Sequence, residues 1–267
     1  MISFKGTKFK RLIVLKAVTL KSIIISVCAA LIFCACCLGV AGGDASEVFL
    51  LSKKRKLPIY GVKTDEKAVA ITFDAAYGAD KTEQIIEILE KYNATATFFL
   101  VGFWVDKYPE LTKEISDRGF EIGTHSNMHE HMSKMSASDI STDLSVSVKK
   151  IENIIGKKVD LFRPPYGEYN NTLIEESQKL GLYPIQWSVD SIDWKGISAN
   201  EMTTRVVSRV HEGAIVLFHN NSDHIVEALP RILELLVARG YKFKTVGEMI
   251  YRDNYNIDNN GMQIKIA

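Results

Sequence analysis

The chain alternates short apolar runs with amphipathic stretches from residue 68 onward. Each apolar run is three to six residues long, which is typical of a strand buried on both faces of a parallel sheet. The stretches between them carry helix-start residues and mostly end at a glycine, as helices do. We therefore expect an α/β fold in which helices connect parallel strands, and seven strands favour a barrel over an open sheet. The expected strands cover residues 68–73, 96–101, 120–123, 161–163, 183–187, 214–218 and 241–245.

The first 43 residues differ from the rest of the chain. Residues 1–21 hold six lysines and arginines and no acid, and residues 22–43 hold no charge at all. About 20 uncharged apolar residues span a bilayer, and basic flanks stay cytoplasmic. We therefore expect a cytoplasmic segment at 1–21, a transmembrane signal anchor at 22–43 and the remaining chain outside the cell membrane. A cleaved signal peptide with a processing site at Gly39-Val40-Ala41 is the alternative.

Cysteine usage and charge exclude several kinds of site in residues 44–267. All four cysteines lie in the apolar segment, so the outer part has no disulfide, no thiol nucleophile and no cysteine metal ligand. It carries 27 basic and 32 acidic residues, a net charge of −5. Because nucleic-acid-binding domains are usually basic, this balance argues against such a partner. The whole chain is 46% hydrophobic and 24% charged, as in an ordinary globular protein.

Residues suited to catalysis gather where the expected strands end. In parallel α/β barrels the active site lies at the carboxyl ends of the strands. Each residue alone has a simpler explanation, because acids often cap helices and single histidines are usually not ligands. The same position recurs after five strands, however, which indicates a shared site. These residues are Asp74, His125, His129, Arg163, Asp190 or Asp193, and His219.

This set of side chains suits metal-assisted hydrolysis of an amide. His125 and His129 are four residues apart, so their ring nitrogens could meet one ion that polarises a carbonyl and lowers the pKa of water. Asp74 could act as the base, and Arg163 could keep it ionised. His219 could protonate the departing amine, with a nearby carboxylate fixing its tautomer. We leave His131 as an exposed loop residue.

The same residues resemble the five motifs of the polysaccharide deacetylases of carbohydrate esterase family 4, the NodB-homology domain. They occur in the family's order across residues 64–250, which is nearly all of the outer part. The resemblance implies a distorted (β/α) barrel that removes N-acetyl groups from GlcNAc or MurNAc polymers such as peptidoglycan. The motifs are Thr72-Phe73-Asp74, His125-x-x-x-His129, Arg163-x-Pro165-Tyr166, Asp190-x-x-Asp193-Trp194 and Leu217-x-His219.

The resemblance assigns the acid–base chemistry residue by residue. Asp74 is the catalytic base, and Arg163 orients it. His219 is the general acid, and Asp193 rather than Asp190 tunes it.

The resemblance also assigns the binding groups. His125 and His129 are ligands of one divalent metal, for which we expect Zn²⁺, with Co²⁺, Ni²⁺ or Mn²⁺ as alternatives. Tyr166 offers its backbone N–H to the oxyanion. Trp194 and Leu217 line the acetyl pocket.

One departure from the family pattern concerns the metal. The family has a second aspartate as its third ligand, and here that position is Ala75, which cannot coordinate. Asp80 in the next loop could substitute, although we favour Asp80 as a helix N-cap paired with Glu83. Loss of the carboxylate should weaken metal affinity.

Two functions therefore stay open at this point. The first is an anchored peptidoglycan N-deacetylase, monomeric, outside the cell membrane or in the spore intermembrane space. The second is a non-catalytic glycan-binding or scaffold protein in spore envelope assembly. The anchor and the segment Phe73–Gly78 resemble a sporulation-associated, PdaB-type branch. We expect a linker at 44–63, the deacetylase domain at 64–250 and a tail at 251–267.

Overall fold

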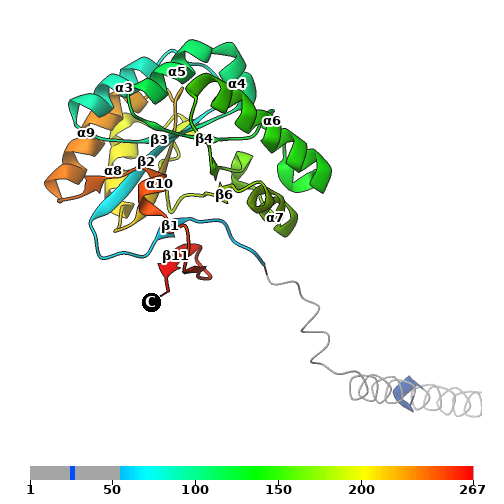
Figure 1. Cartoon of the computed structure of the whole chain (residues 1–267). Coiled ribbons are helices and arrows are strands. Elements are labelled where there is room, and N and C mark those ends of the chain that lie inside the picture. The colour runs from blue at the N-terminus through cyan, green and yellow to red at the C-terminus, as the bar shows by residue number, and fades with distance from the viewer. Residues whose placement is uncertain (1–24, 28–54, 267) are drawn as a thin grey trace, which may run out of the picture. The chain divides into compact units, whose positions relative to one another are not determined.

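The apolar runs of the sequence form one curled sheet (Figure 1). The computed structural model describes residues 25–27, which are helical, and residues 55–266. Each of the seven predicted runs contains a strand. The strands are β1 (Gly61–Val62), β2 (Ala68–Ala75), β3 (Thr97–Leu100), β4 (Glu121–Thr124), β5 (Leu161–Phe162), β6 (Tyr183–Pro184), β7 (Val189–Asp190), β8 (Ala214–His219), β9 (Lys242–Phe243), β10 (Tyr255–Ile257) and β11 (Met262–Lys265).

The pairing of the strands explains how the sheet curls. Its order is β10-β11-β1-β8-β2-β3-β4-β5-β6, with β7 beside β8 and β9 beside β2. The pairs from β8 to β6 are parallel, while β1 runs antiparallel to β8 and β10 to β11. Residues 183–190 bend the sheet back on itself, because β6 pairs with β5 and β7 pairs with β8. The result is a curled half-barrel, consistent with the expected distorted barrel.

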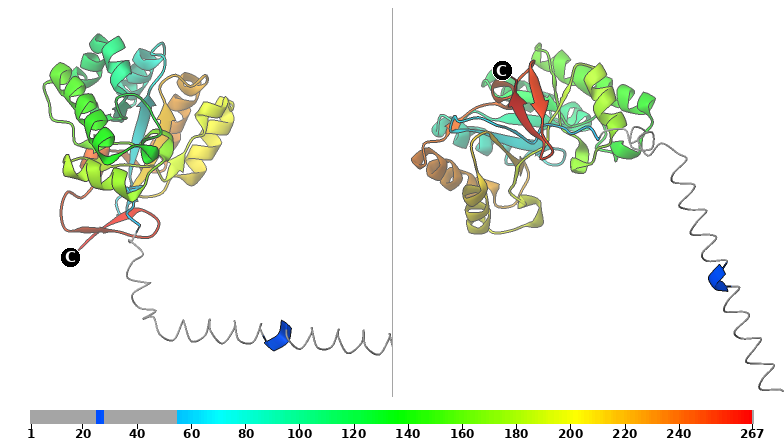
Figure 2. Two further views of the ribbon diagram at one scale, coloured as in Figure 1. Left: turned by 90° about the vertical axis from the view of Figure 1, so that its right-hand side faces the viewer. Right: turned by 90° about the horizontal axis from the view of Figure 1, so that it is seen from below.

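Helices cover the outside of the curl (Figures 1 and 2). Their ends follow local sequence signals: Ser198 and Glu201 form the predicted capping box of α8, and Ser136 caps α6, which ends at left-handed Gly156. The structure adds α4 and α10, which the sequence pattern did not predict. The helices are α3 (Thr82–Lys91), α4 (Gly102–Lys107), α5 (Pro109–Asp117), α6 (Ala137–Ile155), α7 (Asn171–Lys179), α8 (Ala199–Arg209), α9 (Ile225–Ala238) and α10 (Val246–Met249).

The central strand β2 sets which side chains reach the site. All eight of its residues are buried. Val69, Ile71 and Phe73 belong to the main hydrophobic cluster, and Phe73 stacks on Phe98 of β3 with ring centroids 5.1 Å apart. Because successive side chains of a strand point to opposite faces, Thr72 and Asp74 point the other way. The apolar positions of β2 thus fix the direction of its one carboxylate.

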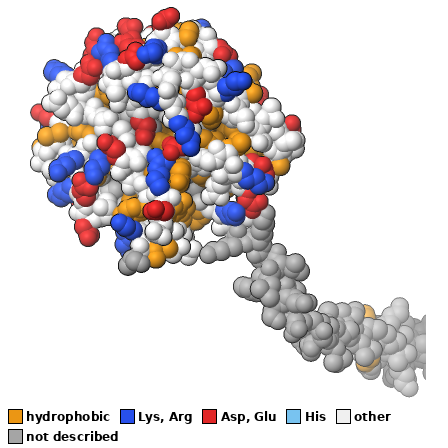
Figure 3. All heavy atoms as spheres, in the orientation of Figure 1, with side chains coloured by type: hydrophobic (Ala, Val, Ile, Leu, Met, Phe, Trp, Pro, Cys, Tyr) orange, Lys and Arg blue, Asp and Glu red, His pale blue; other side chains and the backbone are white. Residues whose placement is uncertain are grey.

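The compact unit is longer at both ends than the expected deacetylase domain. It begins at Arg55, and residues we expected in the linker enter the sheet: Ile59 bridges Ile185, and Gly61–Val62 is β1. Residues expected in the tail form β10 and β11, and β11 pairs with β1. On the face seen in Figure 3, acidic and basic side chains are intermingled.

The predicted membrane anchor at 22–43 lies outside the described residues, except for 25–27. Within the part that the structure describes, no helix has both the length and the apolar character needed to cross a bilayer.

Candidate active site

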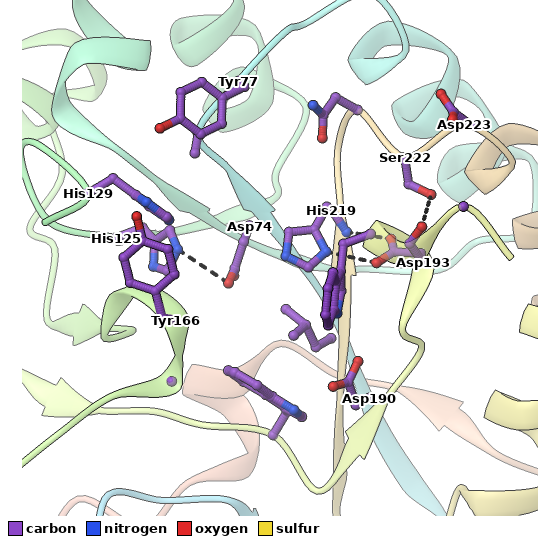
Figure 4. A pocket seen from close by; sticks show the side chains of 17 residues that line it. Asp74, Tyr77, His125, His129, Tyr166, Asp190, Asp193, His219, Ser222 and Asp223 are labelled. Carbon is purple, nitrogen blue, oxygen red and sulfur yellow. Dashed lines mark hydrogen bonds and ion pairs between the residues drawn. The ribbon is translucent and has the colours of Figure 1, made fainter. Parts of the chain in front are cut away.

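A cavity of about 690 Å³ opens at the carboxyl ends of the strands (Figure 4). This volume is within the usual range for small-molecule sites. The structure brings eight of the nine predicted site residues to its wall, and the ninth, Arg163, lies buried behind Asp74. The eight are Asp74, His125, His129, Tyr166, Asp193, Trp194, Leu217 and His219.

Asp74 and Arg163 form a buried ion pair on one side of the cavity. The Nη1 atom of Arg163 lies 2.8 Å from Oδ1 of Asp74 and 2.8 Å from the hydroxyl of Thr72, and its Nη2 donates to the Gln186 carbonyl at 3.1 Å. The guanidinium also lies over the Phe99 ring, 4.1 Å from the centroid. Burial alone would raise the pKa of Asp74, but the charge of Arg163 holds that pKa below its usual value. The carboxylate is therefore ionised at neutral pH and aimed by its partner.

His125, which follows β4, is held in one tautomer. Its Nδ1 lies 2.7 Å from the carbonyl oxygen of Arg163. A carbonyl only accepts, so Nδ1 carries the proton and Nε2 keeps its lone pair. That Nε2 lies 3.5 Å from Oδ2 of Asp74. Burial lowers the pKa of His125, which keeps the imidazole neutral.

His129 lies on a loop with unusual backbone angles. Ser126 and His129 have φ angles of +73° and +55°. Two side chains hold this shape: the Ser126 hydroxyl accepts from the His129 N–H at 2.8 Å, and Asp143 of α6 accepts from the Asn127 N–H at 2.8 Å. The His129 ring lies 5.0 Å from that of His125, centroid to centroid. Burial lowers its pKa to about 4, so this imidazole is also neutral.

These two imidazoles fit a divalent metal ion, but with a short ligand set. Both rings are neutral, and the Nδ1 atom of His129 is buried without a hydrogen-bond partner. Orphaned nitrogens of this kind suit a metal. Among the described residues, no cluster of three or more His, Cys, Asp or Glu side chains could hold an ion. Ala75 is fully buried and packs in the main hydrophobic cluster.

The structure corrects our interpretation of Asp80. This residue lies in a separate groove together with Glu83, outside the site cavity, so it does not supply the missing ligand there. It is not the helix cap either, because α3 has Lys81 as its N-cap and no side-chain capping bond. The predicted N-cap was one residue early, because the N-cap is Lys81 and α3 begins at Thr82.

His219, at the carboxyl end of β8, lies beside Asp74 of β2 and is paired with Asp193. Oδ1 of Asp193 lies 2.7 Å from Nδ1 of His219, and Oδ2 accepts from the His219 N–H at 2.8 Å. Burial lowers the pKa of His219, but the hydrogen bond and charge of Asp193 outweigh it, and the net pKa is raised. Asp190 also lines the cavity, yet its carboxylate accepts from the Ile192 N–H at 2.7 Å and shapes the turn. The structure therefore places Asp193, and not Asp190, on His219.

Three further predicted residues border the cavity. Tyr166 has a φ of +60°, strained for a non-glycine residue, and its side chain is about half exposed. Trp194 is exposed at the rim, and Leu217 of β8 is buried in the wall. Sequence reasoning missed Tyr77, an exposed rim residue whose ring lies 6.0 Å from that of His129. Its position three residues after Asp74 was the only signal in the sequence.

Known proteins are similar to this chain in sequence. A family model for polysaccharide deacetylase matches residues 61–185. YlxY of Bacillus subtilis (strain 168) is 36% identical over 193 residues, covering 72% of this chain and 60% of YlxY. The peptidoglycan-N-acetylmuramic acid deacetylase PdaA of the same strain is 32% identical, covering 70% of this chain and 73% of PdaA. A Bacillus cereus peptidoglycan-N-acetylglucosamine deacetylase is 35% identical over 71% of this chain and 91% of its own length.

Solved structures share the fold. A pseudoenzyme of carbohydrate esterase family 4 from Bacillus anthracis superposes with a TM-score of 0.70 at 34% identity, covering 72% of this chain and 68% of the other. A mutant of that protein with restored enzymatic activity superposes with the same score at 36% identity, covering 72% and 70%. Sequence, fold and cavity agree, and this chain belongs to the polysaccharide deacetylase family.

Proposed function

We propose that this protein hydrolyses N-acetyl groups from GlcNAc or MurNAc residues of peptidoglycan and releases acetate. One observation carries the proposal: a buried Asp–Arg pair and an Asp–His pair with a buried carboxylate lie side by side at the ends of β2 and β8, and both border one cavity. Amide hydrolysis requires a base and an acid that both reach the scissile bond. The relatives named as peptidoglycan deacetylases support the choice of substrate.

The residues of the chain divide the chemistry between them. When a divalent ion such as Zn²⁺ is bound by His125 and His129, it supplies Lewis-acid chemistry that makes water more acidic and polarises a carbonyl oxygen. Asp74 accepts the proton of the attacking water, and Arg163 keeps Asp74 ionised and aimed. The acetyl carbonyl carbon gains the water oxygen as the C–N bond breaks, and protonated His219 gives its proton to the departing amine nitrogen.

The neighbouring groups hold the reacting atoms in place. Asp193 fixes the His219 ring and favours its protonated form, as an acid at neutral pH needs. In this proposal the Tyr166 N–H stabilises the oxyanion, and Trp194 with Leu217 encloses the acetyl methyl group. The anchor at 22–43 holds the domain outside the cell membrane as a monomer. Membership of the sporulation-associated branch remains a prediction.

Acetate release from acetylated peptidoglycan and chitin oligomers tests the function. The full chain in mild detergent is assayed with and without added Zn²⁺, Co²⁺, Ni²⁺ or Mn²⁺. Asp74→Asn and His219→Ala should each lower kcat by about 10²–10⁴. Asp80→Asn is the matched control, because that carboxylate lies outside the cavity. No acetate from the wild-type protein with any of these metals would refute the proposal.

One observation favours a second candidate, a non-catalytic glycan-binding protein. Position 75 lacks the carboxylate expected of the family, and a wild-type pseudoenzyme is among the similar structures. In that case Asp74→Asn and His219→Ala proteins would bind glycan and support the cell as well as wild type does. If the protein is an enzyme, these variants should instead bind glycan but fail to complement a deletion of the gene.

A further inference from the structure

Two loops from neighbouring strands meet beside the cavity. The loop after β4 carries the imidazole of His129, and the loop after β5 carries Tyr166 (Figure 4). His131 follows on the first loop, and its ring stacks on Tyr166 with centroids 4.4 Å apart and planes 19° apart. The ring of His129 meets that of Tyr166 edge-on at 4.6 Å. The Tyr166 ring therefore contacts two histidine rings of the other loop.

Polar contacts join the same two loops just beyond the stacked rings. Nδ1 of His131 lies 2.9 Å from Oε2 of Glu168, and the Ser133 hydroxyl donates to that same oxygen at 3.2 Å. The Asn170 amide donates to the Ser133 carbonyl at 2.7 Å. The hydrogen bond from His131 lowers the pKa of Glu168, so the carboxylate is charged. We name His131, Ser133, Tyr166 and Glu168 the rim clasp.

The clasp holds a backbone shape that is costly in isolation. Tyr166 has a φ of +60°, a conformation that L side chains rarely adopt, and Gly167 follows with a φ of +68°. Adding a Cβ at Gly167 would place it 2.8 Å from the Trp187 ring, so the turn has little freedom to shift on that side. Strained backbone persists only where its surroundings impose it. Here the stacked His131 ring and the Glu168 hydrogen bonds provide that restraint.

We propose that His131 and Glu168 are positioning residues. Through the rim clasp they fix where the Tyr166 N–H lies relative to the imidazoles of His125 and His129. The inference rests on the proposed function, because it assigns that N–H to the oxyanion. Apart from the Tyr166 N–H, the clasp binds no substrate atom. It fixes the distance between two groups that stabilise the same transition state, and small misplacements of such groups are costly in rate.

Loss of the clasp should therefore lower kcat while leaving KM near the wild-type value. An oxyanion donor acts mainly in the transition state, whereas ground-state sugar binding depends on the rest of the cavity. His131→Ala removes both the stack and the hydrogen bond, and we expect kcat to fall by about 10- to 100-fold. His131→Phe keeps a ring on Tyr166 and should recover most of this loss. Glu168→Gln keeps an acceptor and should lose less than Glu168→Ala.

The chain offers a matched control for the loss of an exposed His–Glu pair. Nδ1 of His224, the N-cap of α9, lies 3.5 Å from Oε2 of Glu227, and both residues are outside the cavity lining. Glu227→Ala breaks this pair as Glu168→Ala breaks the one in the clasp. His131 and Glu168 are 48% and 38% exposed, so their substitution should leave the fold intact, which thermal melting of each variant checks.

Two measurements on the full chain in mild detergent test the inference. The first is kcat and KM for acetate release, and the second is hydrogen exchange of the backbone amides of residues 131–134 and 166–168. We expect His131→Ala and Glu168→Ala to speed exchange in both loops and to lower kcat, while Glu227→Ala changes neither. Equal kcat in His131→Ala and Glu227→Ala would overturn the inference, as would a loss that appears in KM alone.

The exchange measurement separates this inference from the proposed function. If the wild-type protein releases no acetate, the proposed function fails. Hydrogen exchange alone then tests whether the clasp restrains the two loops. Exchange rates in His131→Ala that are no faster than in the wild type would overturn the inference.

Discussion

Neutralising one member of the Asp74–Arg163 pair should cost far more stability than neutralising both. Arg163 is fully inaccessible to solvent and Asp74 is 4% exposed, so each charge depends on the other. Asp74→Asn leaves a buried guanidinium without a counter-ion. Arg163→Met, chosen for its similar length, leaves a buried carboxylate and also deprives Thr72 and the Gln186 carbonyl of a donor.

The magnitude follows from the burial of both groups. Breaking a buried ion pair by removing one partner typically costs about 3–5 kcal/mol, because an unpaired charge remains in a poorly polarisable interior. Replacing both partners with neutral groups of similar volume is often nearly neutral. We therefore expect each single variant to lose about 3–5 kcal/mol and the double variant to lose less than either, a coupling of at least about 3 kcal/mol.

Urea unfolding, followed by tryptophan fluorescence, gives the free energy of unfolding of the wild type, the two single variants and the double variant. All three tryptophans lie in the described domain. Kcat for acetate release is measured alongside. All three variants should lose turnover, so only stability separates the double variant from the singles. Additive losses, with the double variant the least stable, would refute a strongly coupled buried pair. An exposed pair such as Arg231–Glu234 supplies the control, with an expected coupling below about 1 kcal/mol.

Three further outcomes are expected. Asp193→Asn removes the group that raises the pKa of His219, so His219 should lose its proton at lower pH. The basic limb of the kcat–pH profile should therefore move to lower pH, and an unmoved limb would contradict His219 as the general acid. Ala75→Asp puts a carboxylate at a fully buried site, so the metal-free variant should melt at a lower temperature than the wild type. Zn²⁺ should then raise the Tm of the variant more than that of the wild type. Equal Zn²⁺-induced Tm shifts in the two proteins would show that position 75 does not reach the ion. Tyr77→Ala removes an exposed ring at the rim, and KM for chitin oligomers should rise about 2- to 10-fold at constant kcat; an unchanged KM would exclude sugar stacking there.

Local signals in the sequence were enough to predict most strands, most helix ends and the aspartate, arginine and histidine residues that pair at the site. Parallel strands bring their carboxyl ends to one edge, so polar residues after Phe73, Gly123, Phe162 and Phe218 had to converge. Serine caps and left-handed glycines act over a few residues, and the predicted ends of α6 and α8 agree with the structure. The site could be located because its residues lie on a strand or in the loop that directly follows one.

Other features depended on contacts between distant segments. Residue types alone left Asp190 and Asp193 open, and the family resemblance favoured Asp193. The structure agrees, because the left-handed turn at Ile192 leaves Asp193 on His219 and Asp190 on a backbone N–H. The capping interpretation of Asp80 failed because helix α3 starts at a turn without a side-chain cap.

The sequence by itself therefore determined the fold class and the chemical groups of the site, because strand periodicity and capping are local. Only the tertiary structure decided how Asp193 contacts His219, that β6 and β7 bend the sheet back on itself, and that His131 reaches Tyr166 and Glu168. His131 is 35 residues from Tyr166 and 37 from Glu168 in the sequence, and these residues lie on separate loops. Their contact depends on how neighbouring strands align in space, which no local pattern encodes.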